Sequence, residues 1–397
     1  MRIVIAGGGI GGLTAALALL RRGVEVQVLE QAHELREVGA GVQVSANGMR
    51  VFADLGIAEE VLALAARPSH REVRLWNTGQ AWVSFDLGAA SLARYGQPYV
   101  TLYRPDLVAV LESAVRRADP GCIRLGQRAI GCGQSSGAAM LRLADGSVVE
   151  GDALIGADGI HSAIRAQLHG ASEAEFTGCV AWRGVIPTEA LPAHLALPIA
   201  ANWVGPGRHM VHYPLRGGAL TNVVGVVERE DWLDEGWTTP GTHTDMLADF
   251  AGWHADVQSL IHAIPQPFLW ALKLRRPLPR WTEGRITLLG DACHPTLPFM
   301  AQGAVMAIED GLVLARALTD IAEVPLALRA YEAARHERTT RVVEGSAANT
   351  RRYHNPILGD PARAAAHVEQ ELAAAPAMER FDWLYRYDAT TSPIPTP

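Results

Sequence analysis

The sequence predicts an α/β fold in which a Rossmann-like dinucleotide-binding domain carries an inserted, mostly antiparallel β-sheet. The first observation is the order of the opening residues. A short apolar strand at 3–6 leads into a glycine-rich turn, a helical stretch rich in Ala and Leu that ends at Gly23, and a second apolar strand. The second observation is a change of pattern near residue 173, after which short strand candidates dominate until about residue 275. One helical stretch, predicted over 243–264, interrupts them.

The glycine-rich turn fits the pattern G-x-G-x-x-G through Gly7, Gly9 and Gly12, with Gly11 as an additional glycine. The first glycine permits a tight turn, the second lets backbone N–H groups approach a pyrophosphate, and the third lets the helix pack close to the strand. The helix N-terminus then offers unpaired N–H groups to the phosphates. Glu30 ends the second strand, where a carboxylate can accept hydrogen bonds from both ribose hydroxyls and disfavours a 2′-phosphate. The motif therefore predicts a site for the ADP half of FAD or NAD.

Composition narrows the class of partner. The chain has 397 residues, of which 49% are hydrophobic and 19% charged, and its formal net charge is −7. This acidic balance, with no basic cluster, argues against nucleic acid and anionic membrane as partners. No apolar run approaches the roughly 18–20 residues of a membrane span, so we expect a cytoplasmic protein. The four cysteines are scattered and the histidines lack ligand spacing, which predicts reduced thiols and no metal site.

Two later strands also end in a glycine and an acid. Residues 153–159 are predicted to form a buried strand that ends in a tight turn with Asp158, and residues 285–291 to form a second buried strand that ends with Asp291. Because ligands of open α/β sheets gather at the carboxyl ends of the strands, we expect both acids near the same ligand as the first motif. Only the first motif is a complete dinucleotide fingerprint. A second dinucleotide is therefore expected to bind transiently.

Over nearly its whole length the chain resembles the class A flavoprotein aromatic hydroxylases, which share the p-hydroxybenzoate hydroxylase fold. The resemblance rests on the glycine motif with Glu30, on Asp158 with Ser162 and Arg165, on the run Gly-Asp-Ala-Cys-His-Pro at 290–295, and on Arg104. It implies an FAD-binding domain of the glutathione-reductase type with non-covalent FAD. In this family the first motif binds the ADP portion, and the arginine matching Arg104 contacts FAD. The acid matching Asp158 serves FAD and transient NAD(P)H, while the acid matching Asp291 holds the ribityl–pyrophosphate portion.

The resemblance also assigns a role to the helix that begins near Gly303 and Ala304. In the family this helix directs its N-terminus at the pyrimidine edge of the flavin. Helix-terminal N–H groups and the helix dipole would stabilise the anionic reduced flavin there.

Within the family, the chain is most similar to the monooxygenases of salicylate, 3-hydroxybenzoate and 6-hydroxynicotinate. The similarity is carried by His209 and Tyr213, by residues 300–304 and by residues 353–356. On a strand, His209 and Tyr213 share one face, which could line the substrate cavity. His209 is suited to deprotonating a phenol, and Tyr213 and Gln302 could position the ring substituents. The alternative is a histidine and a tyrosine that only fill the core. Arg183, Arg208 and Trp203 are all open as binders of a substrate carboxylate.

The resemblance implies a single-component monooxygenase that hydroxylates a phenolic aromatic acid with NADH or NADPH and O2, through a flavin C4a-hydroperoxide. The substrate would be salicylate or a hydroxybenzoate. A decarboxylating hydroxylase of the 6-hydroxynicotinate type, a flavin oxidase, an NAD-dependent dehydrogenase and a non-catalytic flavin protein are the alternatives. The oligomeric state stays open, with a homodimer as one alternative.

The expected FAD-binding domain comprises residues 1–72, 100–172 and 276–350. The substrate domain comprises 73–99 and 173–275. A C-terminal segment with two short helical pieces covers 351–397.

Overall fold

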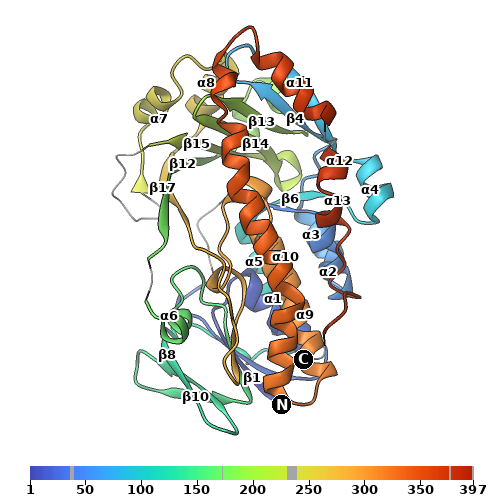
Figure 1. Cartoon of the computed structure of the whole chain (residues 1–397), viewed down its shortest axis with the longest axis vertical. Helices are drawn as coiled ribbons and strands as arrows, with labels where there is room; N and C mark the ends of the chain where they lie inside the picture. The colour runs from blue at the N-terminus through green and yellow to red at the C-terminus, as the bar shows by residue number, and fades with distance from the viewer. Residues whose placement is uncertain (36–39, 172, 230–238, 375–376, 396–397) are drawn as a thin grey trace.

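Five parallel strands form a sheet at one end of the molecule, with the first strand of the chain in its middle (Figure 1). In the computed structural model, which describes residues 1–35, 40–171, 173–229, 239–374 and 377–395, their order is β18-β11-β1-β2-β7. The remaining residues of the predicted domain ranges lie outside the described part. Each pairing within this sheet is parallel. The strands are β1 (Arg2–Ala6), β2 (Glu25–Leu29), β7 (Ile123–Arg124), β11 (Ala153–Gly156) and β18 (Ile286–Leu288).

Two helices pack closely beside this sheet. Helix α1 (Ile10–Leu20) contacts the sheet, and α9 (Gly303–Asp320) packs against α1. A Cβ atom added to Gly11 would lie 2.6 Å from Leu289 Cδ2, and one added to Gly311 would lie 2.7 Å from the Ala15 nitrogen. Because larger side chains would collide at both places, the glycines allow the two helices and the sheet to approach closely.

Smaller elements surround the parallel sheet. One of these is a three-stranded antiparallel sheet, β10-β9-β8, in which residues 144–147 form the turn between β9 and β10, and β3 pairs with β6 in a separate ribbon. The strands are β3 (Gly41–Val44), β6 (Val100–Tyr103), β8 (Ala129–Gln134), β9 (Ala139–Leu143) and β10 (Val148–Gly151). The helices are α2 (Ala46–Asp54), α3 (Ala58–Leu64), α4 (Ala89–Tyr95), α5 (Arg104–Ala118) and α6 (Ala163–His169).

An eight-stranded sheet forms the other end of the molecule, in the order β16-β17-β12-β15-β14-β13-β4-β5. All its pairings are antiparallel except that of β13 with β4. Strand β4 begins at His70, before the predicted boundary at residue 73. The strands are β4 (His70–Leu75), β5 (Ala81–Asp86), β12 (Glu175–Pro187), β13 (Ala200–Gly205), β14 (Arg208–Leu215), β15 (Leu220–Glu228), β16 (Thr239–Pro240) and β17 (Phe268–Leu274).

One face of this sheet is covered by α7 (His243–Asp249) and α8 (Ala255–Ala263). Trp182, Trp203 and Met210 from the strands share an apolar core with Phe250 and Leu260. The single helical stretch predicted over 243–264 is wrong in this respect, because the chain leaves the helix between α7 and α8 to bring Phe250 into that core. The opposite face of the sheet points towards the parallel sheet.

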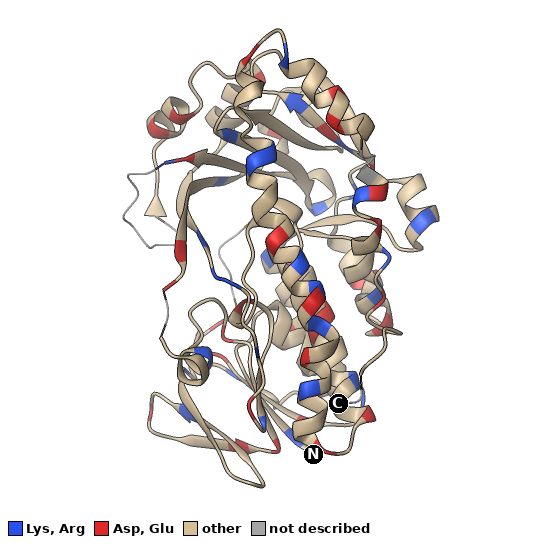
Figure 2. Ribbon diagram, viewed as in Figure 1, with Lys and Arg blue, Asp and Glu red and all other residues tan. Residues whose placement is uncertain are grey.

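The longest helix, α10 (Val324–Tyr353), extends from the parallel sheet to the eight-stranded sheet (Figure 1). Acidic and basic residues are interspersed along it (Figure 2), as expected for a helix with one solvated face. The tail contains α11 (Ala364–Ala374), α12 (Ala377–Arg380) and α13 (Asp382–Tyr385), one helix more than predicted. No helix in the described ranges is both long and apolar enough to cross a membrane.

A buried ionic cluster joins α9 to α10. The Arg335 guanidinium is fully buried and donates from Nη2 to Glu309 Oε2 and from Nε to Asp310 Oδ1, both at 2.7 Å. Arg338 also donates to Glu309, and the imidazole of His294 lies 2.6 Å from Asp310 Oδ2. Burial acts to raise the pKa of both carboxyl groups, but their partners hold it below its ordinary value: Arg338 and Arg335 for Glu309, and His294 and Arg335 for Asp310. Both acids are therefore ionised at neutral pH.

Replacement of Arg335 by Met should unfold the protein more easily, because it leaves two buried carboxylates with too few partners. Breaking a buried ion pair in this way costs about 3–5 kcal/mol. The matched control is Arg329→Met, an exposed arginine on the same helix, which should change the free energy of unfolding little. Chemical denaturation of both variants measures the difference. Equal stability of the two variants would contradict the role assigned to the cluster.

Candidate active site

A cavity of about 370 Å³ lies between the carboxyl ends of the parallel strands and the inner face of the eight-stranded sheet. On the first side it is lined by the glycine turn, by Asp291 and by the start of α9. On the second side it is lined by residues 200–202 of β13 and by alternate residues of β14, among them His209 and Tyr213. The structure thus brings together residues that are far apart in the sequence.

A second hollow of about 630 Å³ lies beside the glycine turn. Glu30, Asp158 and His161 line it, and it shares Gly9 and Arg104 with the first cavity. The two cavities therefore adjoin at the glycine turn. Together they offer more room than a small ligand alone requires, as a site for a dinucleotide must.

The glycines of the turn differ in what they permit. Gly7 has φ +107°, and a Cβ added there would lie 2.3 Å from the carbonyl oxygen of Ala157. A Cβ at Gly12 would lie 2.1 Å from the carbonyl oxygen of Gly7. A Cβ at Gly9, in contrast, meets no atom within 4 Å. Gly7 and Gly12 are thus required by the fold, whereas Gly9 leaves a space that a ligand can enter.

Glu30 and Asp158 are both tied to backbone N–H groups. Glu30 accepts from Gly8 N at 2.6 Å through Oε2 and from Ala32 N at 2.8 Å through Oε1. Asp158 accepts from Ala163 N at 2.9 Å through Oδ2 and so caps α6. Its Oδ1 is buried and has no hydrogen-bond partner among the described residues. Burial raises the pKa of Asp158 above its ordinary value. A donor that approaches Oδ1 lowers this pKa again, because it stabilises the charged carboxylate.

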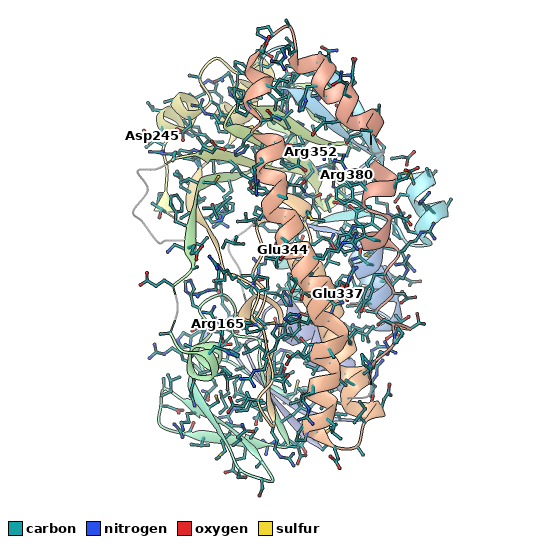
Figure 3. All side chains as sticks on the ribbon, viewed as in Figure 1. Arg165, Asp245, Glu337, Glu344, Arg352 and Arg380 are labelled. Carbon is teal, nitrogen blue, oxygen red and sulfur yellow. The ribbon has the colours of Figure 1, made fainter. Side chains whose placement is uncertain are left out.

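Arg165 lies on α6, away from the long helix α10 (Figure 3). Its Nη2 donates to the carbonyl oxygen of Ile160 at 3.4 Å. Burial lowers its pKa, and the nearby Arg275 lowers it further.

Asp291 follows β18 and presents its carboxylate to the cavity. Asp291 is exposed to the cavity. The protein atoms around it still remove water from its carboxylate and so raise its pKa, while His294 and Arg104 act to lower it. Gly303 and Ala304 line the same cavity at the start of α9. The first intrahelical bond runs from Met306 N to the Gln302 carbonyl, so the N–H groups before it are oriented for an acceptor beyond the helix end.

The Gln302 side chain lies elsewhere. It donates to Ser45 Oγ at 3.0 Å and accepts from Asn47 Nδ2 at 3.1 Å, and Asn47 also donates to Glu309 of the ionic cluster. Gln302 is almost fully buried and is not among the described residues that line the cavity. The geometry therefore favours a role in fixing the start of α9 over the substrate contact predicted for this residue.

His209 and Tyr213 lie on the cavity face of β14, in agreement with their even spacing. The rings of Phe299 and Tyr353 pack against His209, with centroids 5.1 and 5.2 Å away. Burial holds the pKa of His209 well below its ordinary value, so the imidazole is neutral at neutral pH. Burial raises the pKa of Tyr213, so its hydroxyl keeps its proton.

Two arginines line the cavity on the side of the eight-stranded sheet, Arg71 on β4 and Arg183 on β12. Arg71 donates to Tyr99 Oη at 3.0 Å and forms no ion pair with a carboxylate of the described residues. Arg183 lies over the ring of Trp270 at 5.1 Å. Of the three residues considered for a carboxylate, only Arg183 faces the cavity. Trp203 belongs to the core on the other face of the sheet, and Arg208 alternates with His209 along β14.

The residues present fit FAD. An open cradle at Gly9, an accessible carboxylate at Asp291 and a buried Asp158 oxygen that lacks a partner are the features that pyrophosphate, ribityl and hydroxyl groups would satisfy. No three His, Cys, Asp or Glu side chains group as metal ligands in the described part of the chain.

Comparison with known proteins agrees with this fit. The family model of an FAD binding domain matches residues 1–346, so the chain belongs to this family. A 3-amino-4-hydroxybenzoate 2-monooxygenase of Streptomyces platensis is 36% identical over 390 residues, which is 98% of this chain and 96% of that protein. A 6-hydroxynicotinate 3-monooxygenase of Bordetella bronchiseptica is 37% identical over 382 residues, or 94% and 99% of the two chains.

The solved structure of a salicylate hydroxylase substrate complex is 27% identical and has a TM-score of 0.81, with 99% of this chain and 98% of that chain covered. The predicted resemblance to the flavoprotein aromatic hydroxylases is therefore confirmed. The protein is an FAD-dependent aromatic-ring monooxygenase.

Gly9→Ala should fold but bind FAD poorly, because its added methyl group occupies the cradle and strains no neighbouring atom. We expect FAD affinity to fall by about 10- to 100-fold, which corresponds to about 1.4–2.8 kcal/mol. Gly12→Ala should instead lower the yield of folded apoprotein, because its methyl group collides with Gly7. Flavin fluorescence titration and circular dichroism separate the two outcomes. Full FAD affinity in Gly9→Ala would contradict the placement of the cradle.

Proposed function

We propose that this monooxygenase hydroxylates a small aromatic acid that carries a ring hydroxyl, using O2 and NADH or NADPH. The observation that carries the proposal is the set of side chains on the cavity face of one sheet. Arg71 offers a cation, His209 a neutral base and Tyr213 a hydroxyl. A phenolic acid presents an anion, an acidic proton and a polar ring substituent, which match these three groups.

Arg71 supports a carboxylate in the substrate. Its guanidinium lies within the protein beside the neutral Tyr99 hydroxyl, and a guanidinium there gains most from an anion that makes a bidentate pair. In the register of the sheet, Arg71 pairs with Ala200 on β13, the strand next to β14. Arg71 and Tyr213 both line the cavity, so both can contact the same substrate. The three relatives support this class, since their names give a hydroxylated aromatic acid or a salicylate as substrate.

His209 supplies the base. The imidazole accepts the proton of the ring hydroxyl, and the phenolate that results is the more electron-rich ring and the better partner for an electrophilic oxygen. Tyr213 donates to a ring substituent and fixes its orientation. The rings of Phe299 and Tyr353 exclude water from the base.

The residues that would hold FAD follow from the two adjoining cavities. Glu30 would accept from the ribose, Gly7, Gly9, Gly11 and Gly12 would surround the pyrophosphate, and Arg104, Asp158 and Asp291 would contact the remaining polar groups. FAD, when bound, supplies the reduction and the activation of oxygen. Gly303 and Ala304 would stabilise negative charge at the helix N-terminus.

NAD(P)H is proposed as a visiting reductant, because the sequence contains one complete dinucleotide fingerprint. We also propose that the parallel sheet with its helices is a Rossmann-like FAD-binding domain and that the eight-stranded sheet is the inserted substrate domain. The support is the order of the strands and the position of the cavity between the two sheets.

A substrate panel tests this function. The holoenzyme should oxidise NADH or NADPH with salicylate, 3-hydroxybenzoate, 6-hydroxynicotinate or a related acid, and the product should carry a new ring hydroxyl. Arg71→Met should raise KM for the best acid by about 10- to 100-fold, the value of a charged hydrogen bond of about 1.5–3 kcal/mol, and should change kcat little. The matched control is Arg74→Met on the other face of β4, where Arg74 pairs with Glu72.

Two results would count against the proposal. If peroxide is the only product with every acid, the hydroxylase function fails. The assigned substrate class fails if Arg71→Met keeps the wild-type KM for the acid. It also fails if the substitution raises the KM for a phenol without a carboxylate as much as the KM for the acid.

A further inference from the structure

A chain of three hydrogen-bonded side chains leads from the cavity to the surface. His209 Nδ1 lies 2.7 Å from His354 Nε2, and His354 Nδ1 lies 2.9 Å from Glu228 Oε1. The two imidazoles are buried, whereas the Glu228 side chain is 55% exposed. The three residues come from different elements: β14, the residue after α10, and the end of β15. Arg352, labelled in Figure 3, marks the same end of α10.

The chemistry of the three groups gives the chain a direction. A carboxylate only accepts, so His354 must donate from Nδ1 to Glu228. In a neutral His354 the other nitrogen, Nε2, is then an acceptor, and His209 must donate to it from Nδ1. This leaves Nε2 of His209 as the acceptor nitrogen of the residue that lines the cavity. Every donor thus points away from the cavity and towards Glu228.

The surroundings keep this arrangement intact. Burial lowers the pKa of both histidines, and His354 lowers that of His209 further, so each holds one proton at neutral pH. The ring of Tyr353 and the apolar ring of Phe299 pack on His209. Glu228 lies opposite Cys179 of β12, and its neighbour Arg229 pairs with Asp249.

We propose that His209, His354 and Glu228 conduct the proton of the substrate hydroxyl from the cavity to solvent. The proposal rests on the proposed function. The hydroxyl oxygen gives its proton to His209 Nε2 as the proton on His209 Nδ1 passes to His354 Nε2. The proton on His354 Nδ1 then passes to Glu228 and from there to water. One proton enters and one leaves, no electron moves, and each imidazole ends as its other tautomer.

A purely structural role of His354 explains less of the geometry. The backbone already holds this end of α10, because the carbonyl oxygen of His354 accepts from Gly207 N at 3.1 Å. The imidazole adds nothing to that bond. Its two nitrogens instead connect the buried imidazole of His209 to the exposed carboxylate of Glu228.

The test measures proton release when a phenolic acid binds the holoenzyme without NAD(P)H. A pH indicator in a stopped-flow instrument should report rapid release in the wild type. In His354→Ala the release should slow by about 10- to 100-fold, in line with the loss of one proton-transfer group, and added imidazole should restore it. FAD affinity should stay unchanged. The matched control is His367→Ala on α11, which should release the proton at the rate of the wild type.

Glu228→Gln gives a second measurement that does not disturb the buried residues. It keeps an acceptor for His354 but lowers basicity, so release should slow and should regain its rate as the pH rises. An unchanged rate in His354→Ala, or a slower rate that imidazole does not restore, would overturn the proposal. Failure of the hydroxylase function is distinguishable, because it appears in wild-type product analysis, whereas proton release needs no turnover.

Discussion

The buried ion pairs of Arg335 with Glu309 and Asp310 are the constraint on which the rest of the site depends. Charges this deep are stable only when each has partners, and here the partners come from separate parts of the chain. Asp310 accepts from the backbone of Gly290 and contacts His294, which fixes the loop that carries Asp291. Glu309 accepts from Asn47, whose amide also meets Gln302 at the start of α9. The cluster thus holds two walls of the cavity in register with the glycine turn.

The cavity has a charge balance opposite to that of the whole chain. The formal net charge is −7, yet the charged side chains among the described lining residues are Arg71, Arg104, Arg183 and Asp291. This excess of cationic side chains in the cavity favours anionic ligands, and both a dinucleotide and an aromatic acid are anions. The two sheets divide this work, since the parallel sheet presents backbone amides and the antiparallel sheet presents side chains.

Much of the frame could be predicted because local patterns specify it. The turn at Gly7–Gly12, with Glu30 after the next strand, required no tertiary information, and even spacing placed His209 and Tyr213 on one face. Arg71 could not be found in this way, because it reaches the cavity only through the pairing of β4 with β13, which joins Arg71 to Ala200. Strand alternation would have shown that Arg183 faces the cavity and Arg208 does not, if the register of β12 in the sheet had been known. The side chain of Gln302 forms hydrogen bonds near residue 45, and no local sequence pattern predicts these contacts. The contact between His354 and Glu228 could not be predicted either, because it depends on where α10 ends.

The central claim is that the cavity inserts an atom of dioxygen into the ring of an aromatic acid. The most direct measurement is the mass of the product formed under isotopically labelled dioxygen in ordinary water, with the acid that most stimulates NAD(P)H oxidation. We predict that the new ring hydroxyl carries the labelled oxygen in nearly every product molecule. A product with unlabelled oxygen, or labelled peroxide without a hydroxylated product, would contradict the claim.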